Sequence, residues 1–247
     1  MAVTIRFAEW PAPAHVVAGV TLRQGGCSTG PYHSNNLATH VGDNSGHVSA
    51  NRAALQQQLA GSRHWQWLNQ VHGIDVVKAP AADHITADAC YTFSANTVCT
   101  VLTADCLPIL LCDRKGTRVA AIHAGWRSLC GGVIENTLAA MQVPGADLLA
   151  WFGPAIGPQQ FEVGDDVRSA FALAACGEAS MPVFVPRPQV AGKYLCNIYQ
   201  LAAIRLQAKG VNAIYGGSEC TVNQADEYYS YRRDGVTGRM ASFIYLR

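Results

Sequence analysis

The chain of 247 residues carries 18 Lys and Arg against 17 Asp and Glu, which gives a formal net charge of +1. Only 14% of its residues are charged while 49% are hydrophobic, so a large share of the chain must be interior. Nucleic-acid and anionic-membrane partners are disfavoured, because either needs a concentrated basic surface and no long run of like charge occurs.

The N-terminal residues do not have the pattern of a secretory signal, since Arg6, Glu9, Pro11 and Pro13 interrupt the apolar stretch that a signal needs. No window approaches the roughly 18 uninterrupted apolar residues of a membrane span. The nine cysteines are odd in number and include no CxxC pair, which favours free thiols in a reducing compartment. We therefore expect a cytoplasmic protein without a membrane partner.

Helices and strands are predicted to alternate along the chain. A helix over residues 46–60 follows Ser45 as N-cap and carries an apolar stripe at helical spacing. Further helices are expected over 128–141, 164–175 and 195–209, the last ended by Gly210. Strands are expected over 16–21, 75–78, 97–103, 108–112, 118–123, 147–152, 211–215 and 241–246. This order predicts an α+β (α/β) layered fold, and the absence of repeats and linkers predicts a single domain over residues 1–247.

Three segments rich in Gly, Pro and polar residues lie between the apolar elements. They are RQGGCSTG at 23–30, GPAIGP at 153–158 and SYRRDGVTG at 230–238. Long polar turns beside strand ends are where functional sites tend to be assembled. We expect part of a site to come from these turns.

Three further segments place reactive side chains at the ends of apolar runs. His72 lies in NQVHG, Asp105 and Cys106 lie in TADCLPILL, and His123 lies in AAIHAGWRS. Each residue alone also fits an ordinary structural role, as a partly buried histidine, a capping carboxylate or a small buried thiol.

Together, His72, Cys106 and His123 fit a catalytic zinc site, which uses three N or S ligands and keeps one position open. Their separations of 34 and 17 residues match no local zinc-finger pattern, so the fold would have to assemble the site. A hydrolase with Cys106 as nucleophile and a histidine as base explains the same residues almost as well.

The segments NQVHG, TADCLPILL, HAGWR, GPAIGPQQFEVG and YSYRRDGVTGRMASF, in this order, resemble the laccase-domain family of bacterial proteins. The similarity extends from RQGGCSTGPYHSNNLATHVGDN to the last expected strand. It implies a four-layer arrangement with mixed β-sheets between helices, like that of bacterial deamidase toxins. It also implies zinc bound by His72, Cys106 and His123, and phosphorolysis of the purine nucleosides adenosine, inosine, guanosine and methylthioadenosine together with adenosine deamination.

Members of this family have long been named multicopper polyphenol oxidases, and the residues disfavour that activity here. A multicopper centre needs about ten His ligands, commonly in HxH pairs, whereas this chain has eight His and no HxH. Copper can replace zinc at N and S ligands, so an adventitious copper-dependent oxidation of polyphenols is one further hypothesis. A thiol hydrolase or amidase acting on a cell-wall precursor is another, and a metal-carrying binding protein is the last.

Phosphorolysis and deamination require further groups beside the metal ligands. Phosphate needs cationic donors, and the expected substrate-binding residues are Arg23, Asn69, Arg127, Arg232 and Arg233. Arg127 is the leading candidate, because it follows His123 by four residues and is expected near a helix start. Deamination needs an activated water, which an open zinc position can supply. Asp105 is expected to orient a ligand or to carry a proton.

Overall fold

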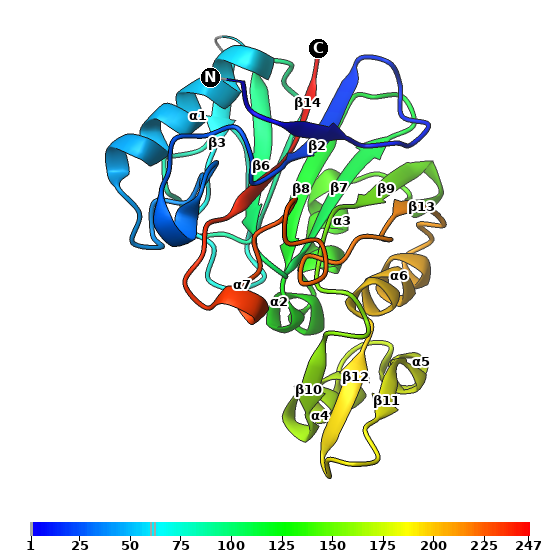
Figure 1. Cartoon of the computed structure of the whole chain (residues 1–247). Coiled ribbons are helices and arrows are strands. Elements are labelled where there is room, and N and C mark those ends of the chain that lie inside the picture. Colours follow the sequence, from blue (N-terminus) through cyan, green and yellow to red (C-terminus); the bar gives the residue numbers. More distant parts are fainter. Residues whose placement is uncertain (1, 60, 62) are drawn as a thin grey trace.

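Two mixed β-sheets packed face to face form the centre of the protein (Figure 1). The structure is a computed structural model that describes residues 2–59, 61 and 63–247. The first sheet consists, in spatial order, of β1 (Ile5–Phe7), β2 (Val16–Thr21), β14 (Met240–Leu246), β6 (Thr97–Thr103) and β3 (His64–Gln66). The second consists of β13 (Ala213–Gly216), β9 (Leu148–Phe152), β7 (Leu107–Asp113), β8 (Val119–Ala124), β5 (Ala89–Thr92) and β4 (Val76–Lys78).

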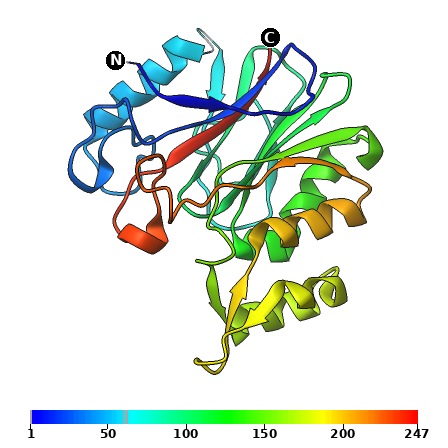
Figure 2. The ribbon, with the colours of Figure 1, turned by 45° about the vertical axis from the view of Figure 1, so that its right-hand side comes forward.

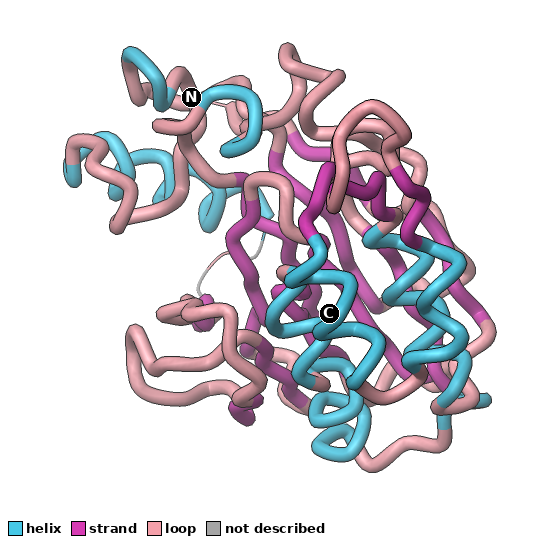
Figure 3. The backbone as a smooth tube through the Cα atoms, turned by 90° about the horizontal axis from the view of Figure 1, so that it is seen from below, coloured by secondary structure: helices cyan, strands magenta, loops and turns pink. Residues whose placement is uncertain are grey.

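Helices cover the outer face of each sheet, so that the strands lie between helices and loops (Figure 3). Helix α1 (Ser45–Leu59) packs on the first sheet, while α3 (Val133–Met141) and α6 (Ile198–Ala208) pack on the second. The short helix α2 (Trp126–Gly131) connects β8 to α3.

Side-chain alternation along the strands explains this layering. In β7, Leu107, Ile109 and Leu111 face the helices, whereas Leu110 and Cys112 face the other sheet. Both faces of the strand are therefore buried, which is why its sequence reads as a continuous apolar run. The predicted four-layer arrangement with mixed sheets is confirmed.

A small lobe projects from the main body below α2 and α6, at the end away from both termini (Figures 1 and 2). Its three-stranded sheet is formed by β10 (Glu162–Gly164), β12 (Lys193–Cys196) and β11 (Phe184–Pro186). Helices α4 (Asp165–Leu173) and α5 (Gly177–Ser180) complete it. Buried lobe residues such as Phe171 and Phe184 belong to the same apolar core as α3 and α6, so the lobe is continuous with the main body.

The long predicted strands agree with the structure to within two residues at each end, and β2 and β6 have the predicted bounds. Several short strands were missed: β1, β3, β5, β10, β11 and β12. Two short helices were missed as well, α5 and the one-turn helix α7 (Tyr231–Asp234), which lies within the predicted turn 230–238. Among the residues that the structure describes, no helix is both long and apolar enough to cross a membrane.

Two predicted helices are wrong in their extent. The helix expected over 128–141 is two helices, because Gly132 adopts a left-handed φ of 107° between α2 and α3. The helix expected over 195–209 begins at Ile198, because the Asn197 side chain accepts a hydrogen bond from the Gln200 N–H and caps it. The predicted 164–175 helix spans Asp165–Leu173, and residue 60, the end of the predicted first helix, lies outside the described residues.

Candidate functional site

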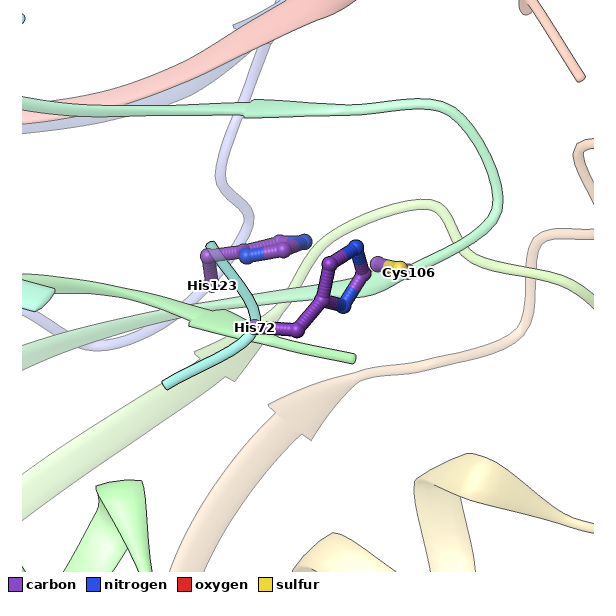
Figure 4. A group of neighbouring side chains, drawn as sticks. All are labelled: His72, Cys106 and His123. Atoms are coloured by element: carbon purple, nitrogen blue, oxygen red, sulfur yellow. The ribbon is translucent and has the colours of Figure 1, made fainter. Parts of the chain in front are cut away.

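His72, Cys106 and His123 converge from three segments that are far apart in the sequence (Figure 4). His72 lies in the loop between β3 and β4, Cys106 in the turn between β6 and β7, and His123 near the end of β8. Since β6 and β7 belong to different sheets, the Cys106 turn lies where the chain crosses from one sheet to the other.

The geometry of the three side chains fits a single metal ion. One donor atom from each residue lies within 4.8 Å of the others. The two imidazole rings meet edge to face, with centroids 4.7 Å apart. Zinc bonds to N and S ligands are about 2.0–2.3 Å long, so a small shift of the exposed His72 side chain would bring the three donors around one ion. The grouping of these three residues inferred from the sequence is therefore confirmed as a possible metal site.

One buried carboxylate, that of Asp88, holds both histidines in place. Its Oδ1 lies 2.7 Å from His123 Nδ1 and accepts a 3.0 Å hydrogen bond from the His72 N–H. Its Oδ2 accepts from the N–H groups of Gly73 at 2.6 Å and Val71 at 3.3 Å. With Nδ1 of His123 engaged, Nε2 is the ring nitrogen left for a metal.

Strand pairing explains why Asp88 reaches His123. Antiparallel pairing of β5 and β8 places Ala89 opposite Ile122. Asp88 precedes Ala89 and His123 follows Ile122, so Asp88 and His123 also lie opposite each other. The backbone reinforces this contact, since the His123 N–H donates to the Asp88 carbonyl at 2.7 Å. Asp88 is fully buried, so its side chain has a fixed direction.

A glutamine fixes the His72 loop from its other end. Gln70 Nε2 donates to the Leu102 carbonyl at 2.8 Å, and its Oε1 accepts from the Leu102 N–H at 2.7 Å. The amide thus pairs with the end of β6 as another strand would. Asp88 and Gln70 together set the position of a histidine whose own side chain is exposed.

Charges around the site favour neutral His72 and protonated His123 when no metal is bound. Burial is the largest influence on the pKa of His123 and lowers it, but the charge of Cys106 and the hydrogen bond with Asp88 outweigh burial and raise it to about 9. Burial, followed by the charge of His123, lowers the pKa of His72. The pKa of Asp88 is lowered, because its contact with His123 outweighs its burial. Metal and proton therefore compete for His123.

Asp105 links three segments around Cys106. Its Oδ1 accepts from Thr221 Oγ1 at 2.6 Å, and its Oδ2 accepts from the Arg232 N–H at 2.6 Å. Its carbonyl accepts from the Ile156 N–H at 2.9 Å. The backbone of Asp105 has a positive φ of 87°, so these bonds stabilise an unfavourable conformation immediately before Cys106.

A cavity of about 490 Å³ lies over the three donors, within the size range of small-molecule sites. Apolar and aromatic side chains form part of its wall: Trp126, Ile156, Phe161, Ile198 and Tyr231. Cationic or titratable side chains form another part: His40, Arg127, Arg232 and Arg239.

The structure brings only some of the predicted substrate-binding residues to this cavity. Arg127 and Arg232 line it, as does Asp105. Arg23, Asn69 and Arg233 are not among its lining residues. Arg23 donates to the carbonyls of His33 and Ala225, Asn69 to Thr86 Oγ1, and Arg233 to the carbonyls of Thr221, Val222 and Tyr228.

Sequence reasoning missed Asp88, Gln70, His40 and Arg239. The Gln70 signal was available, because this residue lies in the NQVHG segment beside His72. Asp88 gave only a weak signal, a lone carboxylate before a strand of four residues. His40 and Arg239 reach the cavity from opposite ends of the chain. Both lie in segments that carry the family resemblance, but nothing within those segments marks them as cavity residues.

Asp88→Asn provides a test of how the histidines are held. We expect it to weaken metal binding by about 10–100-fold. An asparagine has only one accepting oxygen, so it cannot accept both from the His123 ring and from all the N–H groups of the His72 turn. Metal affinity would be measured by competition with a chromogenic chelator. Asp113→Asn is the matched control: Asp113 is also buried and accepts from Thr117 and Arg118 N–H groups, at the other end of β7. Equal losses in both variants would contradict the role of Asp88.

Comparisons with known proteins agree with the resemblance seen in the sequence. Purine nucleoside phosphorylase PA4543 of Pseudomonas aeruginosa is 50% identical over 97% of both chains. Purine nucleoside phosphorylase YfiH of Escherichia coli is 49% identical over 96% of this chain and 97% of that protein. The crystal structure of Neisseria meningitidis protein NMB0706 superposes with a TM-score of 0.94 at 47% identity, over 98% of this chain and 99% of that chain.

More distant relatives have the same fold. The crystal structure of YlmD from Geobacillus stearothermophilus superposes with a TM-score of 0.85 at 32% identity, over 96% of this chain and 94% of that chain. The family model described as multi-copper polyphenol oxidoreductase laccase matches residues 17–247, which include the three donors and the residues that line the cavity. The chain therefore belongs to the multi-copper polyphenol oxidoreductase laccase family.

Proposed function

We propose that this chain is a zinc-dependent purine nucleoside phosphorylase that acts on adenosine, inosine, guanosine and methylthioadenosine and also deaminates adenosine. The observation that carries the proposal is the His72–Cys106–His123 group on the wall of a cavity that also holds arginine side chains. The names of relatives at about half identity support the same activity. A purine nucleoside and phosphate are the substrates that such a cavity would hold.

The donor set fits zinc better than a copper oxidase centre. Two imidazoles and a thiolate are ligands that both metals accept, but a multicopper centre needs many more histidines than this group provides. A zinc ion held by His72, Cys106 and His123 would supply Lewis-acid polarisation and a water of lowered pKa. No second group of three such ligands occurs in the part of the chain that the structure describes.

The remaining residues of the cavity suggest how substrates are held. The aromatic faces of Trp126, Phe161 and Tyr231 offer surfaces for a purine ring. Arg127 offers charged donors to phosphate, and its guanidinium carbon lies 4.3 Å from the centroid of the Trp126 ring. In phosphorolysis a phosphate oxygen bonds to C1′ of the ribose as the C1′–N9 bond breaks, and a proton must reach the departing base.

A thiol hydrolase acting on a cell-wall precursor is the second candidate, and one specific contact favours it. Cys106 Sγ lies within 4.8 Å of a ring nitrogen of His123, which in turn contacts Asp88. This order of thiol, imidazole and carboxylate also occurs in cysteine hydrolases. Metal dependence separates the candidates, because zinc bound to the Cys106 thiolate would block its use as a nucleophile.

The first experiment measures metal content and turnover together. We expect about one zinc per chain by elemental analysis, and release of free base and ribose 1-phosphate from inosine only when phosphate is present. Chelation should abolish turnover and zinc should restore it. Cys106→Ala should lose metal and turnover together, while Cys176→Ala, a thiol of the lobe, should keep both. Amide hydrolysis that survives chelation, without nucleoside turnover, would instead establish the thiol hydrolase.

A substitution at Gly125 tests whether metal binding requires the His72 and Cys106 side chains to lie directly against the backbone of this residue. A Cβ at this position would lie 2.4 Å from His72 Nδ1 and 3.1 Å from Cys106 Sγ. Gly125→Ala should therefore displace His72 and weaken zinc affinity at least about tenfold, with the fold retained in circular dichroism. Gly46→Ala, whose added Cβ would meet only the Asn44 side chain, is the control. Normal zinc binding by Gly125→Ala would show that the site tolerates a shift of His72.

Arg127 tests whether phosphorolysis and deamination have separate requirements. Deamination of adenosine at C6 consumes water and needs no phosphate site, whereas phosphorolysis requires a phosphate site. Arg127→Ala should lower kcat/KM for inosine phosphorolysis at least about tenfold, equivalent to roughly 1.4 kcal/mol of transition-state stabilisation. Ammonia release from adenosine should fall less. Equal losses in both reactions would assign Arg127 a structural role.

A further inference from the structure

Arg239 contributes a positive charge to the cavity and forms no ion pair with a carboxylate of the described residues. Its Nη1 donates to the carbonyls of Thr237 and Gly238, both at 2.9 Å. None of the ion pairs in the described parts of the chain includes it. No acceptor from those parts engages Nε or Nη2, so this edge of the guanidinium can receive a ligand with two parallel hydrogen bonds.

Two other arginines around the site, Arg232 and Arg233, differ in this respect, whereas Arg127 does not. Arg232 lines the cavity, but its guanidinium donates to the carbonyls of Gln160 at 3.1 Å and Glu162 at 3.2 Å. Arg233 is engaged by three carbonyls and by Asp234. Arg127 lies over the Trp126 ring and has no hydrogen-bond acceptor among the described residues. Among the described residues, the arginines of the cavity that keep a free two-donor edge are therefore Arg239 and Arg127.

Both cations lie near the candidate metal ligands. The charges of Arg127 and Arg239 each contribute to lowering the pKa of His72, after burial and the charge of His123. Burial, the largest influence, lowers the pKa of Arg239, although Cys106 and Asp105 act in the opposite direction. Asp105 forms no ion pair with Arg239, and its two carboxylate oxygens accept from Thr221 and from the Arg232 N–H.

A half-buried guanidinium without a counter-ion costs free energy unless an anion binds beside it. The cavity offers space for that anion, since Arg127, Arg239 and the three donors line the same hollow. A tetrahedral oxyanion can accept from both guanidinium groups at once, which a planar purine ring cannot do.

We propose that Arg239 and Arg127 form an oxyanion subsite beside His72, Cys106 and His123, and that it binds inorganic phosphate with the free Nε–Nη2 edge of Arg239. The identity of the anion as phosphate rests on the proposed function, whereas the subsite itself rests on the arrangement of the two arginines. Arg239 thereby becomes a substrate-binding residue in addition to those expected from the sequence.

Phosphate binding to Arg239→Gln provides the test, with a readout that needs no turnover. In the wild-type protein, phosphate should raise Tm, and calorimetry should give a Kd for phosphate. In Arg239→Gln we expect that Kd to increase at least about tenfold, with zinc content unchanged by elemental analysis. KM for phosphate should increase in parallel, while KM for inosine stays within about twofold. Arg114→Gln, at an exposed arginine outside the cavity, should match wild type.

Arg239→Lys keeps the charge without the two-donor edge, and its Kd should lie between those of wild type and Arg239→Gln. Wild-type phosphate affinity in either variant with its metal bound would overturn the subsite. The subsite would also be overturned if these variants lost binding of nucleoside monophosphates while their affinity for inorganic phosphate stayed unchanged. Phosphate binding that depends on Arg239 in a protein without phosphorolysis would support the subsite and contradict the proposed function.

Discussion

The candidate site depends on the buried carboxylate of Asp88. One oxygen contacts the ring of His123 and the backbone of His72, and the other caps the turn at Gly73. Without it, the N–H groups of the His72 turn would lose their acceptor, and the His123 ring would lose the hydrogen bond that orients it. Burying an ionised carboxylate is costly, and four hydrogen-bonding partners offset that cost. The two histidines are thus positioned before any ligand arrives, which is what a metal site requires.

The two-sheet core gives this carboxylate a rigid setting. Strands β7 and β8 are buried on both faces, so the ends that carry Cys106 and His123 cannot shift without disturbing two packed cores. The chain changes sheets between β6 and β7, and the crossing turn holds Asp105 and Cys106. Asp105 ties that turn to Thr221 and to the start of α7. Segments from most of the chain therefore meet at one end of the two sheets.

Sequence alone could identify the donors because His72, Cys106 and His123 each follow or precede a strongly apolar run. Long strands such as β6 and β7 were found for the same reason, whereas three-residue strands such as β3 exist only through pairing with a neighbour. Asp88 depends on the register of β5 against β8, which no local pattern encodes. The arginines were hardest to rank, because any arginine can lie at the protein surface. Only the structure shows which guanidinium groups already donate hydrogen bonds to the protein.

The distribution of charge bears on which chemistry the site supports. Cys106, His123 and Asp88 would suffice for a thiol nucleophile, and that reaction needs no additional cations. Arg127 and Arg239 add two positive charges to the same cavity without matching carboxylates among the described residues. A metal cation bound beside them would be repelled unless Cys106 is ionised and a further anion is present. Metal and oxyanion should therefore favour each other's binding, and this coupling fits the proposed phosphorolysis better than amide hydrolysis.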